Sequence, residues 1–351
     1  MLHRLRALTA FVLLAAAGPV GAAIDGPVRI ESGLVHGVTN GNITAFKGVP
    51  FAAPPVGDLR WREPQPPADW QGVRNAGHFS AACFQAKSGA FGPWSAEFIA
   101  KNAMEGGSSE DCLYLNVWTP AAEAGERRPV MVWIYGGGFT SGSGDVPVYD
   151  GAGLASKGIV MVTFNYRVGT LGFLAHPELS KESGHGASGN YALLDMLAAL
   201  KWVRRNISAF GGDPGNVTIA GQSAGAFAVN YLMASPLAKG LFERAIAESG
   251  GAFSQAQPLD PAEAAGAKLG TLADLRAKPA DAFLRPPNGY RPGPVIDGYV
   301  LPEDASAIFS AGSQNDAAHR LECQRRRRLR TASHSRSFPR KRAAHLRSAR
   351  G

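Results

Sequence analysis

The fold assignment depends on the stretch Val217-Thr218-Ile219-Ala220-Gly221-Gln222-Ser223-Ala224-Gly225-Ala226. A β-branched run leads into a Gly-x-Ser-x-Gly turn, and the alanine-rich sequence that follows favours a helix. A serine on such a strand-to-helix turn carries its hydroxyl above a sheet, and the two glycines remove side chains where the turn would clash. In a chain with 43 Gly the motif can occur by chance, so by itself it is weak evidence for a nucleophile. The predicted strand before it and the predicted helix after it support that interpretation. Ser223 is therefore a candidate nucleophile.

Apolar runs separated by helical or glycine-rich segments predict an α/β fold, with a mostly parallel sheet covered by helices on both faces. The expected strands are residues 110–118, 129–135, 159–166, 217–220 and 245–247, after small antiparallel strands across 28–46. Three helices are expected: one capped by Asn190 and ending before Gly211, one over 224–234, and one over 260–275. The proline-rich segment 47–61 is expected to lack regular structure and wrap the surface, and residues 295–301 to form a hairpin.

The charge divides the chain into a body and a tail. The net charge of the whole chain is +8, but from Ala317 onward eleven Arg and one Lys stand against a single acid, so residues 1–316 have a net charge of −3. At the other end, a basic start, the apolar run Ala7–Ala17 and small residues up to Ala23 predict a signal peptide over residues 1–23, with cleavage near Ala22 or Ala23. We expect an exported protein, periplasmic or extracellular, with no transmembrane segment; a buried first helix is the alternative.

Export permits disulfides, so Cys83 and Cys112 are expected to pair within the body, while Cys323 in the tail is left over. Free buried cysteines are the alternative. No constellation of residues suggests a metal or a cofactor, so we predict neither.

Three consecutive glycines follow a predicted apolar strand in Tyr135-Gly136-Gly137-Gly138-Phe139. Backbone N–H groups without a neighbouring side chain can closely approach the oxyanion of a tetrahedral intermediate. We assign this donor function to the amides of Gly137 and Gly138, with Ala224, the residue after the candidate nucleophile, as the third. A flexible glycine turn is the alternative.

Seven stretches follow one another along the chain, at residues 46–52, 109–117, 136–139, 165–167, 189–191, 210–214 and 221–225. In this order they resemble the type-B carboxylesterases, the α/β-hydrolase group that includes cholinesterases and bacterial p-nitrobenzyl esterases. The resemblance covers about residues 28–316 and implies Ser223 as nucleophile, an oxyanion hole of Gly137, Gly138 and Ala224, and a Cys83–Cys112 disulfide. At Gln222 the chain departs from cholinesterase-like members, which have a glutamate there, and this weakens the case for cationic choline esters.

A serine nucleophile of this fold needs an acid and then a histidine later in the chain. After Ser223 the only histidines are His319, His334 and His345, in arginine-rich sequence with no predicted strand or loop to hold them. In the family, an apolar strand and an Asp-Glu-Gly motif follow a stretch like 295–316; here Ala317–Arg328 stands in that place. We favour a frameshift near Asp316 over a genuine basic tail. The catalytic acid and histidine would then be missing from a C-terminally truncated α/β-hydrolase domain at 24–316, with 317–351 a disordered or out-of-frame tail.

The sequence thus favours a secreted carboxylic ester hydrolase that acts through an acyl-serine, in a truncated and nearly inactive form, with a small-molecule ester as its partner. A non-catalytic binding or adhesion protein on the same fold is the alternative. The Arg325–Arg328 run could attract nucleic acid, but a solvated tail fits an exported chain better, and we expect no nucleic-acid partner.

Overall fold

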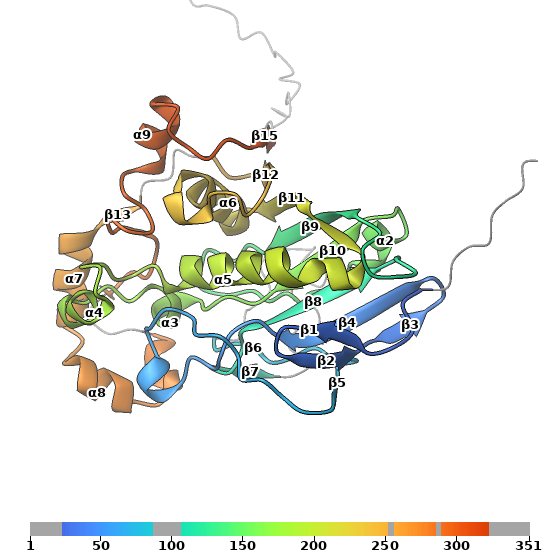
Figure 1. Cartoon of the computed structure of the whole chain (residues 1–351). Helices are drawn as coiled ribbons and strands as arrows, with labels where there is room; N and C mark the ends of the chain where they lie inside the picture. Colours follow the sequence, from blue (N-terminus) through green and yellow to red (C-terminus); the bar gives the residue numbers. More distant parts are fainter. Residues whose placement is uncertain (1–22, 87–106, 252–255, 286–288, 323–351) are drawn as a thin grey trace, which may run out of the picture.

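The computed structural model describes residues 23–86, 107–251, 256–285 and 289–322, the last five by their backbone. Its centre is an eight-stranded mixed sheet (Figure 1). In spatial order its strands are β15 (Ala318–Glu322), β12 (Arg244–Glu248), β11 (Gly212–Gln222), β9 (Arg128–Ile134), β10 (Val160–Phe164), β8 (Tyr114–Thr119), β4 (Ile43–Pro50) and β3 (Val38–Asn40).

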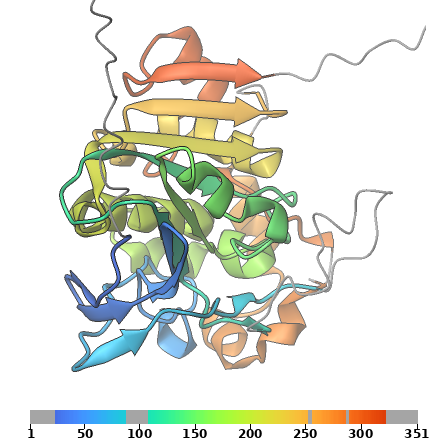
Figure 2. The ribbon, with the colours of Figure 1, turned by 90° about the vertical axis from the view of Figure 1, so that its right-hand side faces the viewer.

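Strand direction divides this sheet into two halves. From β15 across to β10 every neighbouring pair is parallel, and Figure 2 shows β15, β12 and β11 as arrows that point the same way. The strands β8, β4 and β3 continue the sheet with antiparallel pairings. Residues 120–127 between β8 and β9 are too few for the crossover that a return in the parallel direction requires. The predicted α/β fold with a mostly parallel sheet is confirmed, and the antiparallel half is an addition to it.

Helices lie on both faces of the sheet, as predicted. The helices α5 (Tyr191–Asn206) and α6 (Ala224–Ala234) contact β11, whereas α2 (Ala152–Ala155) contacts β10 and β8. Successive side chains of β9 point to opposite faces, so Val132 joins the large core with α5 and α6 while Met131 packs with Ala155 of α2. The other helices are α3 (Gly169–Phe173), α4 (Pro177–Ser183), α7 (Leu259–Ala267), α8 (Leu272–Ala277) and α9 (Ala305–Ser310).

Three small sheets surround the central one. The first holds the predicted antiparallel pair at the start of the body together with a third strand. Two parallel pairs of two residues each tie neighbouring loops together. Their strands are β1 (Val28–Ile30), β2 (Gly33–His36) and β5 (Val73–Asn75), then β6 (Ala82–Cys83) with β7 (Ser108–Ser109), and β13 (Gln257–Pro258) with β14 (Val295–Ile296).

The prediction for residues 47–61 is wrong. Residues 47–50 are the last part of β4, and Val49, Phe51 and Trp61 are buried. The prolines do interrupt regular structure beyond residue 50, but the apolar and aromatic side chains between them pack inward. Burial of such side chains outweighs the preference of proline-rich sequence for the surface.

Local details of three other predictions also need correction. The expected helix over 260–275 is divided into α7 and α8, and Gly270 between them has a φ of 131°. Residues 295–301 form no hairpin, because β14 pairs with β13. Asn190 precedes α5, but its side chain does not cap the helix. Instead, Asn190 Nδ2 donates to Val295 O (2.7 Å), and Asn190 Oδ1 accepts from Val295 N–H (3.0 Å). In the last two cases a long-range partner outweighs the local pattern.

The sheet extends beyond the predicted domain boundary at residue 316. The strand β15 runs parallel to β12, with Ala245 opposite His319 and Glu248 opposite Glu322. The first residues of the predicted tail therefore form a strand, and the expectation that His319 has no strand context is wrong. The predicted signal sequence up to Ala22 and the tail from Cys323 lie outside the described residues.

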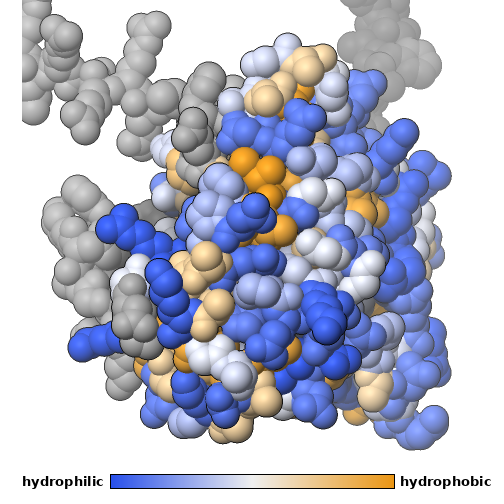
Figure 3. All heavy atoms as spheres, turned by 90° about the vertical axis from the view of Figure 1, so that its left-hand side faces the viewer, coloured by the Kyte–Doolittle hydropathy of each residue, from blue (hydrophilic) through white to orange (hydrophobic). Residues whose placement is uncertain are grey.

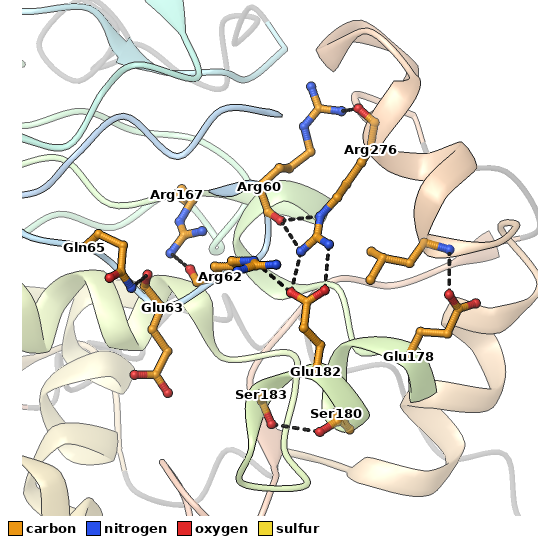
Figure 4. Close-up of polar contacts among 11 residues, drawn as sticks. Arg60, Arg62, Glu63, Gln65, Arg167, Glu178, Ser180, Glu182, Ser183 and Arg276 are labelled. Atoms are coloured by element: carbon orange, nitrogen blue, oxygen red, sulfur yellow. Dashed lines mark hydrogen bonds and ion pairs between the residues drawn. The ribbon is translucent and has the colours of Figure 1, made fainter. Parts of the chain in front are cut away.

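Ion pairs and hydrogen bonds connect α4, α8 and the neighbouring loops at one end of the sheet (Figure 4). Arg60 pairs with Glu110 and donates from Nη1 to the carbonyl oxygens of residues 275, 276 and 278. Arg276 donates to both carboxylate oxygens of Glu182 (2.7 Å each), and this hydrogen bonding holds the pKa of Glu182 below its usual value. The surface around α4 and α8 is mostly hydrophilic (Figure 3).

The pair of Arg167 and Asp195 is the most deeply buried of these. Asp195, on α5, is fully buried and Arg167 is 3% exposed. Asp195 accepts from Arg167 Nη2 (2.7 Å), from Nε (2.9 Å) and from the Arg167 backbone N–H (2.9 Å). These hydrogen bonds to one carboxylate fix the loop after β10 against α5.

We predict that Asp195→Ala lowers the free energy of unfolding by about 3–5 kcal/mol, because it leaves the Arg167 guanidinium buried and unpaired. Arg205→Ala is the matched control on the same helix, since Arg205 pairs with Glu31 at the surface, where a pair contributes about 0–1 kcal/mol. Urea unfolding of both variants measures the difference. Equal losses in the two variants would contradict the prediction.

Candidate active site

Ser223 lies between the end of β11 and the start of α6, as the sequence predicts. Its backbone has φ 55° and ψ −122°, in a region that residues other than glycine rarely occupy. The surroundings hold it there: Ser223 N–H donates to Glu248 O (2.9 Å), and Ser223 O accepts from Phe227 N–H (3.0 Å). The residue as a whole is half-buried.

The glycines of the turn allow β9 to approach it closely. A Cβ at Gly225 would lie 2.0 Å from Ile134 O, and one at Gly221 would lie 2.5 Å from Gly225 O. Both contacts are with backbone atoms, which cannot rotate away as a side chain can. The sequence pattern suggests that side chains at these two glycines would clash. The structure shows that they would clash with the end of β9 and the start of α6.

The glycine loop lies against this turn. A Cβ on Gly136 would lie 2.7 Å from Gln222 O and 3.1 Å from Ser223 Cβ. Gly137, Gly138 and Phe139 have positive φ values of 121°, 63° and 61°, so the loop curls tightly, and Gly137 and Gly138 are exposed. The structure therefore brings together the loop and the serine.

The proposed donor amides are available for a ligand. Within the described ranges, no hydrogen bond engages the N–H of Gly137 or Gly138. Ala224 is the first residue of α6, where an N–H has no partner inside the helix and where the helix dipole favours negative charge. Such amides can stabilise an oxyanion that forms beside Ser223.

Two stacked tyrosines support the base of the glycine loop. The rings of Tyr135 and Tyr166 lie 4.2 Å apart. Tyr135 OH donates to Tyr166 O (3.1 Å), and Tyr166 OH donates to Tyr135 O (2.8 Å). Burial raises the pKa of both hydroxyls well above the usual value, so they stay neutral hydrogen-bond donors. Sequence reasoning assigned no function to this pair, although both tyrosines end predicted strands.

Cys83 and Cys112 form a disulfide, with an S–S distance of 2.09 Å. Both residues are buried and belong to the main core. The disulfide therefore anchors the two ends of the segment 84–111 next to the antiparallel half of the sheet.

No described histidine touches Ser223, and no described side chain forms a hydrogen bond with its hydroxyl. His176 is buried and its Nε2 lies 3.0 Å from Gly270 O, while His185 stacks on Tyr299. His319 pairs with Ala245, three residues before Glu248 and hence about 10 Å upstream of the strand ends that meet at the turn. His334 and His345 lie outside the described residues.

One cavity is lined by residues that directly follow the glycine loop, and its volume is about 360 Å³. Thr140 and Ser141, directly after the loop, form part of its wall, and Phe283 and Tyr290 form another part. Its described lining contains no side chain of Asp, Glu, Lys, Arg or His. A second cavity, of about 260 Å³, lies at α4 and is lined by several charged side chains.

Among the described residues, no cluster of three or more His, Cys, Asp or Glu side chains is arranged to bind a metal ion. No helix there combines the length and the apolar character needed to cross a membrane.

Comparison with known proteins agrees with this geometry. Residues 25–319 match the model of the carboxylesterase family. Fumonisin B1 esterase of Sphingopyxis macrogoltabida is 49% identical over 310 residues, which are 83% of this chain and 55% of that protein. Para-nitrobenzyl esterase of Bacillus subtilis is 38% identical over 305 residues, which are 82% of this chain and 60% of that protein.

A solved structure gives the same result. A carboxylesterase of Geobacillus stearothermophilus superposes with a TM-score of 0.73 at 37% identity, covering 84% of this chain and 60% of its own. The chain thus spans between half and two thirds of the length of these relatives. Its fold is the α/β-hydrolase fold, and the chain belongs to the carboxylesterase family.

Proposed function

We propose that this chain is built to hydrolyse carboxylic esters through an acyl-enzyme on Ser223. The observation that carries the proposal is the strained Ser223 backbone beside a glycine loop with free amides. Ser223 Oγ attacks the ester carbonyl carbon and the amides of Gly137, Gly138 and Ala224 hold the oxyanion. The alcohol then leaves with a proton, and water hydrolyses the acyl-serine to the acid.

We further propose that the chain is truncated and weakly active. The family match ends at residue 319, and no described residue supplies a base to Ser223. Loss of the base from a serine triad reduces turnover by about 10⁶-fold, and the oxyanion donors and binding leave about 10³–10⁴-fold over water. A non-catalytic binding protein on this fold is the second candidate, because it would need no base.

The cavity beside the glycine loop suggests the class of ester. With no charged group in its described lining, it favours an uncharged acyl or alcohol portion over a cationic one. Gln222, directly before the nucleophile, is also neutral, which likewise favours an uncharged substrate. The names of two relatives supply compounds to test, a p-nitrobenzyl ester and fumonisin B1. The cavity favours the uncharged p-nitrobenzyl portion of the first of these.

We also propose that the chain is exported and that its signal peptide is removed near Ala22 or Ala23. The basic, apolar and small segments of residues 1–23 support this, and so does the disulfide between Cys83 and Cys112, which suits an oxidising compartment.

The first test is residual hydrolysis of p-nitrophenyl acetate by the purified chain. We expect a slow rate that Ser223→Ala removes, because the serine is positioned but not activated. Ser156→Ala is the control, since Ser156 is exposed and its hydroxyl donates to Gly153 O of the same short helix. Turnover typical of a complete serine hydrolase would contradict the truncation, and a rate unchanged in Ser223→Ala would contradict the serine mechanism.

The second test is retranslation of the coding DNA beyond Asp316 in the other two frames. We expect an apolar strand, then an Asp-Glu-Gly stretch and a later histidine between glycines. The chain completed with that sequence should recover about 10⁶-fold in turnover, as expected when a base is restored. Stop codons in both alternative frames would contradict the frameshift.

N-terminal sequencing of the protein from the culture medium or periplasm tests export. The expected first residue is Ala23 or Ile24. An intact Met1 on protein that is found only in the cytoplasm would contradict the proposal.

A further inference from the structure

We infer that Gln85 is a positioning residue for the oxyanion loop. The inference rests on the proposed function of Ser223 and extends it to a side chain 138 positions earlier in the sequence. Gln85 lies two residues after Cys83, and its amide forms a two-point contact with the backbone of Gly142. Its Nε2 donates to Gly142 O (2.7 Å), and its Oε1 accepts from Gly142 N–H (2.8 Å).

Gln85 is itself held in place. Its Nε2 also donates to Cys83 O (2.9 Å), and its backbone N–H donates to Ser108 Oγ (3.2 Å). The disulfide fixes Cys83 to the core at Cys112. The amide of Gln85 is therefore a fixed point, and the contact with Gly142 transmits that position to the glycine loop.

Gly142 is in direct contact with the start of the loop. A Cβ at Gly142 would lie 2.4 Å from the Tyr135 ring and 2.6 Å from Gly136 O, so its backbone packs tightly on both residues. Between them, Gly137 O accepts from the N–H groups of Thr140 (3.1 Å) and Ser141 (3.2 Å). Residues 136–142 thus form a closed loop, with Gly136 against the serine turn at one end and Gly142 on Gln85 at the other.

The loop backbone has other polar contacts on both sides of Gly142. Gly169 N–H donates to Phe139 O (2.7 Å), and Ser143 Oγ and Gly144 N–H donate to Asn165 Oδ1, one and two residues after Gly142. Gly137 and Gly138, which carry two of the proposed donor amides, are exposed. If Gln85 releases Gly142, the donor amides can move relative to Ser223 while the turn at Ser223 stays in place. A displacement of about 1 Å from productive geometry can cost about 10²-fold in rate.

Hydrogen exchange on the purified full chain tests the contact directly. We expect Gln85→Ala to raise the exchange rate of amides in residues 136–142 by about 10-fold or more, because the opened amide of Gly142 loses its acceptor. Exchange in residues 217–227 should stay unchanged. Gln65→Ala is the matched control, because Gln65 is exposed and its side chain donates to the neighbouring Glu63 O, away from the glycine loop. Unchanged exchange in residues 136–142 of Gln85→Ala would overturn the inference.

Residual ester hydrolysis tests the link to catalysis. Gln85 also lines the cavity after the glycine loop, so its truncation changes KM as well and kcat is the decisive readout. We expect Gln85→Ala to lower kcat by about 10- to 100-fold, since donors that act on the oxyanion affect the transition state more than binding. A change confined to KM, or no change while Ser223→Ala removes the activity, would overturn the inference and leave the proposed function standing. Activity that survives Ser223→Ala would overturn the proposed function instead.

Gln85→Glu separates positioning from general stability. A protonated carboxyl group has the shape of the amide and restores both bonds to Gly142, whereas the carboxylate cannot donate to Gly142 O. We expect the kcat of this variant, as a ratio to the unmodified chain, to rise as the pH falls through about 4–5. A ratio that does not change with pH, with the unfolding midpoint of the variant held constant, would overturn the inference.

Discussion

The close approach of two backbone segments is the constraint on which the site depends. The end of β9 passes so near the start of α6 that Gly225 has no room for a side chain beside Ile134 O. This contact sets Ser223 in its unusual backbone conformation and places the loop that follows β9 directly beside it. Parallel pairing of β9 with β11 makes this possible, because both strands end at the same edge of the sheet.

Much of this arrangement could be predicted, because the signals are local. The strand before Ser223, the helix after it and the glycines around it are adjacent in sequence, so their pattern predicts their geometry. The strands β9, β10 and β12 are short apolar runs, and their positions are predicted to within one or two residues. The candidate oxyanion donors Gly137, Gly138 and Ala224 stand shortly after such strands in the sequence, so proposing them requires no knowledge of distant contacts.

The errors have a common physical cause, which is interaction between residues far apart in sequence. Asn190 has the sequence features of a helix cap, but Val295 takes its side chain. The burial of Trp61 depends on Phe283 and on Thr170 O, and neither is visible from the proline-rich sequence around Trp61. The strand β15 forms within basic sequence because β12 offers it a free edge, and the contact of Gln85 with Gly142 leaves no pattern in either segment.

Arg60 also determines the order in which the structure can be completed during synthesis. Three of its hydrogen bonds go to carbonyl oxygens at residues 275, 276 and 278, more than 200 positions later. Its partner in the first half of the chain is Glu110, which becomes available much earlier. The same is true of the nearby Cys83–Cys112 disulfide. A nascent chain therefore carries a partly satisfied guanidinium until α8 has left the ribosome. The first 120 residues therefore cannot form all the hydrogen bonds of Arg60 by themselves. A chain interrupted before residue 278 would leave the buried Arg60 guanidinium without part of its acceptors.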